Sequence, residues 1–475
     1  MNKIKIGLVA LATLMLTSCD SWLDVNTDPN YPSEIPTVMP LTSGIGTAAN
    51  LIGGQYAILG SMWGQHLTQT NTANQYKDWD AYNVNSKLLN SEYMKMYAGS
   101  LFDFKKAIQR SEAEGDWNIY LMATVMDVYC YQLMADLYEK VPYSEACRAD
   151  EGLVKPKFDE GQAIYTDLLA RLDAALAKDF SAPGCTNPKL NDLVFEGNMQ
   201  SWKEFANTLK LKIAIRQFKA KSEESTRVIN ELLNSGATFL SKNAQVGGYK
   251  DSPGNYNPLY DSEVHGLGNA NLSASNTTLK FITMNNDPRL PFMYTKGNKG
   301  DYQGLDQGDY TKPAADQPTG SLSKAQIKAS DPVVFISAAE SSFLQAEALL
   351  RCKAGVGAKD KYEEGVRRAF ARYGIESQAE GLLVAGAAYE YTTQNALKSI
   401  ITQKWLSMFL SQGLEAFFEF NRTGFPSEFT VSKQSILTDK TAFVQRLVFP
   451  EYELISNKDN TPARIEPDVK LWWAK

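Results

Sequence analysis

Apolar residues recur at intervals of three and four along much of this 475-residue chain. This spacing places them on one side of an α-helix, where they can pack against a neighbouring element. The clearest runs cover residues 122–137, 165–176, 202–216, 343–350 and 396–410. The sequence therefore predicts a mainly α-helical fold.

The predicted helices come in pairs with short joins, such as the one at residues 353–359. Small and aromatic residues that suit the packing of such a pair follow that join: Tyr362, Gly365, Val366, Ala369 and Tyr373. Joined pairs of this kind are typical of tetratricopeptide-like repeats. We predict that these pairs form a right-handed scaffold with a large loop-rich face.

Two regions interrupt the helical pattern. Between about residues 236 and 334 the composition changes to Gly, Asn, Pro, Asp and Tyr, without clear helices or strands, and residues 65–90 form a shorter irregular region. Long irregular segments are unusual in a compact domain and are often functional. We therefore look for a ligand site in these two regions.

Aromatic residues stand among Asn, Gln and Asp in both irregular regions, and they are the candidate ligand-binding residues: Tyr76, Trp79, Tyr82, Tyr249, Tyr256 and Tyr260. A flat ring can stack on the apolar face of a sugar while neighbouring polar groups bond its hydroxyls. Such a site binds without reacting. The alternative is that these rings fasten long loops to the helical body.

Histidine catalysis has little to build on, because His66 and His265 are the only histidines. The two lie far apart in sequence, which leaves multi-histidine metal sites and most Ser-His-acid schemes with little to build with. We expect His66 to end or pack a helix and His265 to lie in a loop. A glycosidase needs only two carboxylates, so the 54 Asp and Glu residues neither exclude nor support hydrolysis. We assign no catalytic residue.

No cofactor or metal is predicted either. The chain has no Gly-rich loop with Rossmann or Walker spacing. Asp301, Asp306 and Asp309 could offer oxygens to calcium, but they miss the alternating spacing of an EF-hand loop and are better interpreted as a solvated acidic turn. A net charge of −6 argues against a nucleic-acid partner.

The cysteines after residue 19 are widely spaced and form no Cys-x-x-Cys pair: Cys130, Cys147, Cys185 and Cys352. We predict no disulfide framework. Because Cys130 and Cys352 stand in helical apolar patterns, we expect them to be buried as small hydrophobic residues.

The N-terminus has the charged, apolar and small-residue zones of a signal peptide. Lys3 and Lys5 precede an apolar run over residues 6–16, which is too short to span a membrane. The run ends in Leu16-Thr17-Ser18-Cys19, which matches the bacterial lipobox. We predict a signal peptide at residues 1–18, lipid on Cys19, an extended proline-punctuated tether at residues 19–40 and a single helical domain at residues 41–475. The lipid would anchor the chain to a membrane surface.

Several segments along the chain resemble those of the SusD/RagB-like outer-membrane lipoproteins of the Bacteroidetes. The opening segment is Leu23-Asp24-Val25-Asn26-Thr27-Asp28-Pro29-Asn30, and the next is Asp136-Leu137-Tyr138 with Val141-Pro142-Tyr143-Ser144-Glu145-Ala146, where Glu139 and Lys140 replace the usual Gly-Asp. Then follow Trp202-Lys203-Glu204-Phe205-Ala206-Asn207-Thr208-Leu209-Lys210-Leu211, Asn286-Asp287-Pro288-Arg289-Leu290, Ala338-Ala339-Glu340 with Ala346-Glu347-Ala348, Gln403-Lys404-Trp405 and Asn421-Arg422-Thr423-Gly424-Phe425-Pro426. Each is weak alone, but their order and spacing are specific.

The resemblance implies a tetratricopeptide-like body that sits at the cell surface as a lid on a SusC-like TonB-dependent outer-membrane transporter. Such a protein hands captured nutrient to the transporter without catalysis. In family members with known glycan ligands, the site is an aromatic arc on the loops. An oligosaccharide is the expected ligand here, with peptides as the main alternative. A helical-repeat scaffold for other proteins and a surface hydrolase are the competing functions.

Overall fold

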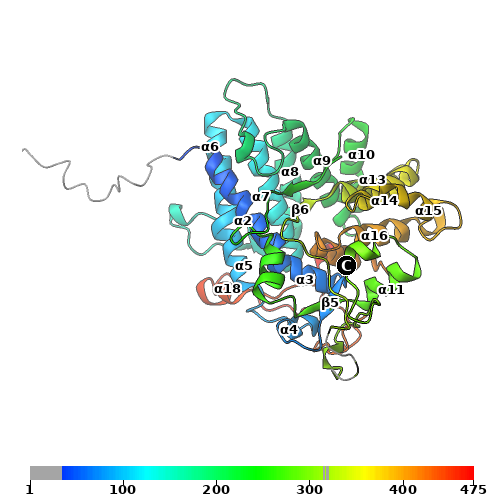
Figure 1. Ribbon diagram of the computed structural model, residues 1–475. Helices are drawn as coiled ribbons and strands as arrows, with labels where there is room; N and C mark the ends of the chain where they lie inside the picture. The colour runs from blue at the N-terminus through cyan, green and yellow to red at the C-terminus, as the bar shows by residue number, and fades with distance from the viewer. Residues whose placement is uncertain (1–34, 314–315, 317–319) are drawn as a thin grey trace, which may run out of the picture.

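The computed structural model describes residues 35–313, 316 and 320–475 (Figure 1). The predicted signal peptide, Cys19 and the predicted tether as far as residue 34 lie outside the described residues. The predicted end of the tether is wrong, because helix α2 begins at Val38 and not after Pro40. A proline fits there, since the first turn of a helix has N–H groups without intrahelical partners.

Helices make up most of the described chain, and they include all five predicted runs. The longer ones are α2 (Val38–Gly53), α3 (Gln55–Trp63), α6 (Phe102–Glu114), α7 (Trp117–Tyr138), α8 (Gly161–Leu176), α9 (Met199–Arg216), α10 (Ser222–Asn234), α11 (Asn276–Met284), α13 (Ala338–Cys352), α14 (Ala358–Ala371), α16 (Ala396–Ser407) and α17 (Gly413–Thr423). Shorter helical segments include α4 (Lys77–Asp80), α5 (Asn90–Lys95), η1 (Met96–Leu101), η4 (Tyr260–Gly266), α12 (Leu290–Met293), η5 (Asp309–Thr311), α15 (Glu380–Leu383) and α18 (Glu451–Ser456). The last predicted run ends early, at Ser407 and not at residue 410. Within the described chain, no helix combines the length and the apolar character needed to cross a bilayer.

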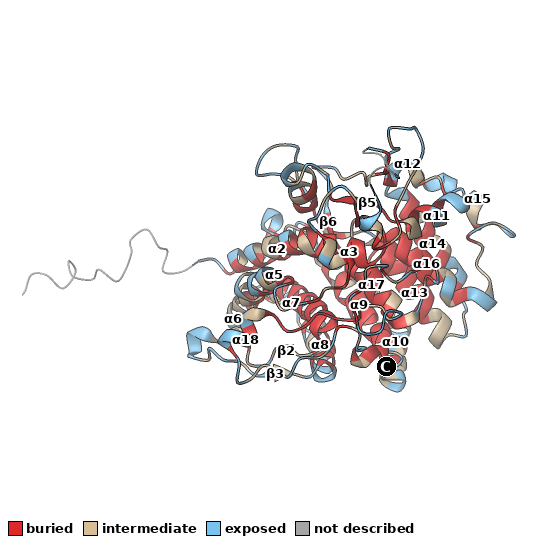
Figure 2. Ribbon diagram, turned by 90° about the horizontal axis from the view of Figure 1, so that it is seen from below, coloured by how far each residue is buried: buried red, intermediate tan, exposed pale blue. Residues whose placement is uncertain are grey.

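Helix α7 lies at the centre of the helical body. Nearly all of its residues are buried, which is the pattern of a helix that packs on every side. The Asp116 carboxylate caps its start by accepting the N–H of Ile119 at 3.2 Å. Helices α6 and α8 pack on α7, and α9 packs on both α7 and α8. Figure 2 shows the buried positions concentrated on the inner helices, among them α7, α9, α13, α16 and α17.

Successive helices pack as pairs with short joins. Residues 217–221 join α9 to α10, and residues 353–357 join α13 to α14, which agrees with the predicted join. The ring of Phe343 on α13 lies 6.2 Å from that of Tyr362 on α14, in a second core that also contains Val366. The prediction of a mainly α-helical fold with tetratricopeptide-like pairs is confirmed.

The described chain contains three short antiparallel ladders. They pair β1 (Leu67–Gln69) with β5 (Leu272–Ala274), β2 (Val141–Pro142) with β3 (Phe158–Asp159), and β4 (Ala244–Val246) with β6 (Val333–Ile336). The interpretation of residues 236–334 as lacking clear elements is therefore wrong, since β4, η4, β5, α11, α12 and β6 fall there. Strands of three or four residues are too short for periodicity to reveal them.

Helices α3 and α17 meet at two glycines. A Cβ on Gly60 would lie 2.2 Å from the backbone nitrogen of Leu414, and a Cβ on Gly413 would lie 2.4 Å from the carbonyl carbon of Gly60. Only glycine at both positions allows the two backbones to approach this closely. The contact fixes the start of α17, which carries Glu415 and Glu419 into the interior.

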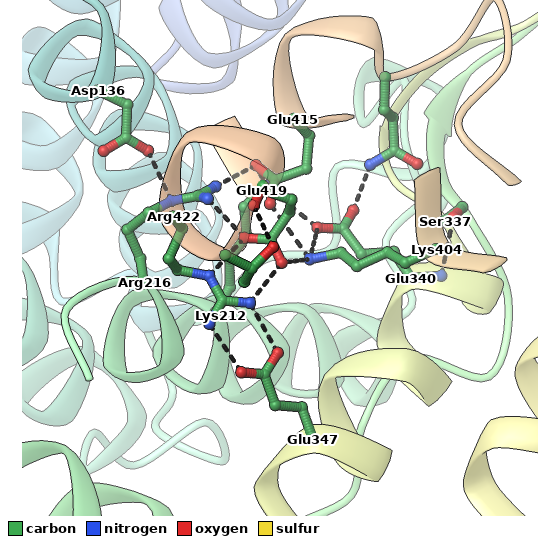
Figure 3. Close-up of polar contacts among 12 residues, drawn as sticks. Asp136, Lys212, Arg216, Ser337, Glu340, Glu347, Lys404, Glu415, Glu419 and Arg422 are labelled. Carbon is green, nitrogen blue, oxygen red and sulfur yellow. Dashed lines mark hydrogen bonds and ion pairs between the residues drawn. The ribbon is translucent and has the colours of Figure 1, made fainter. Parts of the chain in front are cut away.

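Charged side chains cluster where α7, α9, α13, α16 and α17 meet (Figure 3). The members of this ion network are Asp136, Lys212, Arg216, Glu340, Glu347, Lys404, Glu415, Glu419 and Arg422, with side chains at most 7% exposed. Arg351 joins it at the rim through Glu347, at 2.7 Å. Buried charges persist only when they are paired and hydrogen-bonded. The helices that supply these charges are therefore held in one arrangement.

Two glutamates of α17 hold the centre of the ion network. Glu419 lies 2.6 Å from both Arg216 and Arg422 and 3.3 Å from Lys404. Burial alone would raise the pKa of Glu415, but three surrounding cations, Arg216 foremost, hold that pKa at about 2. At Asp136 burial outweighs Arg216, which lies 3.3 Å away, and raises the pKa to about 6.

Replacing Glu419→Gln should destabilise the fold by about 3–5 kcal/mol, because it leaves buried cations without their counter-charge. Urea unfolding followed by circular dichroism measures this loss. Glu231→Gln serves as the control, since Glu231 pairs with Arg227 on the exposed surface of α10 and should matter little. Equal stability of the two variants would contradict a structural role for the ion network.

The ion network should also make the protein sensitive to acid. The pKa of Glu415 is lower in the folded chain than its usual value of about 4.3. The unfolded chain therefore binds more protons as the pH falls from about 4.5 towards 2, and stability is lost in that window. We expect the urea concentration at the unfolding midpoint to decrease as the pH is lowered from 4.5 towards 2. The decrease should be less steep in Glu415→Gln. Glu231→Gln should keep the full slope, and a midpoint independent of pH would contradict the assignment.

Candidate functional site

The two irregular regions of the sequence meet in the structure. Strand β1 from the first pairs with β5 from the second, with Thr68 opposite Ser273. Beyond the ladder, the N–H of Thr70 donates to the carbonyl of Asn271 at 2.7 Å, and the N–H of Gln75 donates to its side-chain oxygen at 3.1 Å. Figure 1 shows α4 and β5 close together at the loop-rich end of the molecule. Segments about 200 residues apart in sequence are thus brought together.

Helix α4 presents Trp79 at this surface. The Trp79 ring is partly buried and tilts against the ring of Tyr76, with centroids 4.9 Å apart. Its backbone carbonyl accepts the indole N–H of Trp63 at 3.0 Å. The N–H of Tyr76 donates to the side-chain oxygen of Gln69 at 2.7 Å. These bonds fix the tryptophan from behind and leave part of its ring exposed.

Asp80, next to Trp79, anchors α4 to two other segments. Its buried carboxylate accepts the hydroxyl of Thr68 at 2.9 Å and the N–H of Gly308 at 3.1 Å. Burial raises the pKa of Asp80 to about 6 despite these bonds. Gly308 has φ +83°, and a Cβ there would lie 2.6 Å from the backbone nitrogen of Lys433. This glycine lets the loop that carries Tyr310 pack closely against residues 432–434 while its N–H bonds Asp80 on α4.

Segment η4 presents a second group of rings. The ring of Tyr256 lies 5.1 Å from that of Tyr260 and 4.9 Å from the imidazole of His265. His265 is more than half exposed and contacts Asp261 at 3.1 Å. On the inner side of η4, the buried Glu263 accepts the N–H groups of Asn271 and Leu272 at 3.2 and 3.1 Å.

Glu263 also connects the two groups of rings. Burial raises the pKa of Tyr76, and the neighbouring Glu263 carboxylate adds to the increase, which places the Tyr76 hydroxyl beside η4. On the other side of α4, the ammonium of Lys77 lies 5.4 Å from the centre of the Tyr310 ring. We call the partly or fully exposed rings of this surface the ring face: Trp79, Tyr256, Tyr260, His265 and Tyr310.

Three predicted ligand-binding rings therefore lie on the ring face, and three do not. Tyr76 and Tyr82 are 2% and 5% exposed, so they pack inside and cannot offer a ring to a ligand in this structure. Tyr82 lies against the backbone of Ser432, from a segment 350 residues later in the chain. Tyr249 is partly buried against the main core, and burial raises its pKa to about 12. For these three, fastening of loops to the body is the better description.

Tyr310 and His265 belong to the ring face although neither was among the predicted ligand residues. Tyr310 follows Gly308 and Asp309 in a glycine-rich stretch, which is a turn signal that could have drawn attention to it. The expectation that His265 lies in a loop is wrong, because it is part of η4. Nothing in the local sequence indicates that its ring meets Tyr256.

Polar groups surround the rings. Asp78 is exposed and accepts the side-chain amide of Asn83 at 3.2 Å, and Asn71 donates to the carbonyl of Lys312 at 3.2 Å. Gln75, at the start of α4, is also exposed. Amide and carboxylate groups beside a partly exposed tryptophan are what a sugar needs, since its hydroxyls bond to them while its apolar face stacks.

The acidic turn considered for calcium holds a lysine. The ammonium of Lys433 lies 2.9 Å from both Asp306 and Asp309. Partial burial opposes ionisation of Asp306, but the hydrogen bonds from Lys433 and Asn276 lower its pKa to about 2. Among the described residues, no group of three His, Cys, Asp or Glu side chains could hold a metal ion.

The remaining titratable candidates are structural. His66 is fully buried, its Nε2 contacts the carbonyl oxygen of Trp405 at 3.1 Å, and burial lowers its pKa to about 3. It is neutral at pH 7. It follows the end of α3 and stacks on Trp405 of α16, in line with the expectation that it ends or packs a helix. The cysteines of the described chain, Cys130, Cys147, Cys185 and Cys352, are free thiols. Cys130 is buried as expected, and Cys352 is only partly buried.

The comparison with known families agrees with this architecture. Residues 29–450 match the SusD-like family described as starch-binding and associating with the outer membrane. The chain belongs to the SusD-like family. Its fold is shared with a SusD homologue from Bacteroides uniformis (22% identity, TM-score 0.76, 92% of this chain and 99% of the other). A SusD-like protein from Bacteroides thetaiotaomicron (24%, 0.75, 92% and 98%) and a chitin-binding SusD homologue from Flavobacterium johnsoniae (20%, 0.77, 92% and 98%) are similar in structure. No curated protein matches the sequence.

Replacing Gly308→Ala in this SusD-like protein should destabilise it more than Gly300→Ala does. Both glycines have positive φ, +83° and +81°, so each alanine costs roughly 1–2 kcal/mol of backbone strain. A Cβ at Gly300 meets open space, whereas one at Gly308 collides with the backbone of Lys433. We expect about 1–3 kcal/mol of additional loss at Gly308 in urea unfolding. Equal losses would show that the loop can move away from residues 432–434 without cost.

Proposed function

We propose that this SusD-like protein is a cell-surface lipoprotein that captures oligosaccharides and passes them to a partner TonB-dependent outer-membrane transporter. Family membership supports carbohydrate binding at the outer membrane. The observation that carries the proposal for this chain is the ring face, where Trp79 and the Tyr256–Tyr260 pair lie on loops fastened to a rigid body. The chitin-binding activity named for the similar Flavobacterium protein makes a β-linked glycan a reasonable first ligand to test.

The ring face is proposed to bind without catalysis. His66 is sealed inside the helical body with a pKa of about 3, so it cannot exchange protons with a ligand at neutral pH. Asp80, whose pKa of about 6 would suit an acid catalyst, uses its carboxylate to hold Thr68 and Gly308. The acidic groups at the surface are therefore proposed to bond sugar hydroxyls.

Anchoring is proposed to depend on lipid at Cys19, with the segment before α2 as the tether. A binder held beside its transporter raises the local concentration of ligand, so moderate affinity is enough for delivery. Rapid release then favours transfer to the transporter. The open, partly exposed ring face suits such a site better than an enclosed cavity would.

Binding of the chain without residues 1–19 to an array of polysaccharide fragments and peptides tests this proposal. We expect a glycan to bind, and Trp79→Ala to weaken that binding by roughly tenfold or more, which corresponds to about 1.4 kcal/mol of lost stacking. Trp117→Ala is the matched control, because Trp117 is also a partly exposed tryptophan but lies at the start of α7.

The other outcomes have distinct meanings. A peptide ligand lost in Trp79→Ala would keep the ring face and change the cargo. A glycan that binds equally well to Trp79→Ala would place the site elsewhere on the protein. Cleavage of an incubated glycan would contradict a purely binding function. Silence of the whole array would favour a protein-docking scaffold.

A further inference from the structure

A large groove lies outside the ring face. Its volume is about 1010 Å³, near the upper end of the range of roughly 300–1,000 Å³ for small-molecule sites. The walls come from residues 194–196, the β4–β6 ladder, α12, and the ends of α13, α14 and α16. These residues differ from those of the ring face, and the proposed capture of ligand by the rings does not use them.

The groove carries positive charge although the protein as a whole is negative. Lys242, Lys328 and Arg372 are exposed at its wall, and none of the three forms an ion pair within the described residues. The acidic residues of the lining are Glu196, which is exposed, and Asp331, whose carboxylate accepts the backbone N–H of Lys328 at 2.9 Å. In a chain of net charge −6, three unpaired cations in one hollow indicate an anionic partner.

Backbone dipoles and hydrogen bonds shape this charge further. The first turn of α13 lines the groove, and the N-terminal end of a helix is electropositive. The C-terminal ends of α14 and α16 also reach it, with the opposite sign. Arg372 lies at the end of α14, where its Nη1 donates to the carbonyl of Phe409 at 2.7 Å and to the hydroxyl of Ser411. A guanidinium has five N–H donors, so this anchored side chain retains donors for a ligand.

The groove also offers an exposed ring. Phe292 on α12 is 42% exposed, and its ring lies 5.9 Å from that of Tyr373 at an angle of 37°. Side-chain amides of Asn243, Gln245 and Gln326 stand in the same lining. A ring platform with amides nearby suits a sugar, and adjacent cations suit a sugar that carries an acid group.

We propose that this groove binds acidic oligosaccharides, in which carboxylate or sulfate groups pair with Lys328, Arg372 and Lys242 while a sugar ring stacks on Phe292. The inference deepens the proposed function, since it takes the ligand to be a glycan. A direct link joins the groove to the ring face: the N–H and side-chain amide of Asn257, next to Tyr256, donate to the carbonyls of Ala329 and Asp331 at 2.8 and 2.9 Å. The wall of the groove and the segment that carries Tyr256 are therefore neighbours in the fold.

Calorimetry of the mature protein with three tetrasaccharides tests the proposal. Tetragalacturonate supplies carboxylates, its methyl ester is the neutral counterpart, and a κ-carrageenan tetrasaccharide supplies sulfate. We expect at least one acidic probe to bind, the methyl ester to bind roughly tenfold more weakly than its parent, and added salt to weaken binding of the acidic probe. The acidic probe that binds identifies the anionic group.

Variants locate the site. Lys328→Gln with Arg372→Gln should weaken the acidic probe roughly tenfold or more. Lys458→Gln with Lys470→Gln removes two exposed charges near the C-terminus and should leave binding unchanged. Lys328→Gln alone removes an exposed charge without touching the Arg372 hydrogen bonds, so it should weaken the probe in a protein that folds normally. Trp79→Ala should retain binding of the acidic probe.

The proposal is overturned if neither acidic probe binds, if the double groove variant binds as the wild type does, or if Trp79→Ala alone abolishes binding. Failure of the ring face is a separate result. If a neutral glycan binds Trp79→Ala as tightly as the wild type, the ring face is not its site. This holds whatever effect the groove variants have on binding of an acidic probe.

Discussion

The rest of the structure depends on the ion network at the meeting point of five helices. Its charges come from segments nearly 290 residues apart, from Asp136 on α7 to Arg422 on α17. They are neutralised only by ion pairs with one another. Apolar contacts between helices tolerate a small shift of one helix along another. Ion pairs do not, because the shift leaves a charge buried and unpaired. This constraint fixes how the two halves of the helical body sit against each other.

A fixed body matters because the loops have little regular structure of their own. Strand β1 follows directly on α3, which the Gly60–Gly413 contact holds against α17. Trp405 on α16 donates its indole N–H to the carbonyl of Gly64, at the turn into β1. The position of α4, which carries Trp79, therefore depends on the same helices that carry the ion network. Loops on a rigid scaffold can display partly exposed rings at a defined spacing.

The helical body could be predicted from sequence, and the ring face only in part. Long helices can be recognised in the sequence because each repeats its apolar residues over several turns. Segments that resemble those of the family, such as Gln403-Lys404-Trp405, supply members of the ion network. Exposure of a ring is a different matter, because it depends on which distant segment covers it. Tyr76 and Trp79 look alike in sequence, yet η4 lies over the former. The position of Tyr310 depends on a loop whose Gly308 packs against residues 432–434 and bonds Asp80.

The ring face and the groove are proposed to recognise glycans in two different ways. On the loop that carries Tyr310, Asp306 and Asp309 hold Lys433. Recognition at the ring face is therefore proposed to rest on the rings and on the amide and carboxylate groups around them. In the groove, Lys242 and Lys328 are exposed and form no ion pair among the described residues, so their charges remain available to a ligand. A cation that is paired within the protein contributes little to ligand binding, whereas an unpaired cation in the groove favours a ligand that carries acid groups. The pairing of charges, more than the number of rings, is therefore proposed to separate the sugars that the two surfaces prefer.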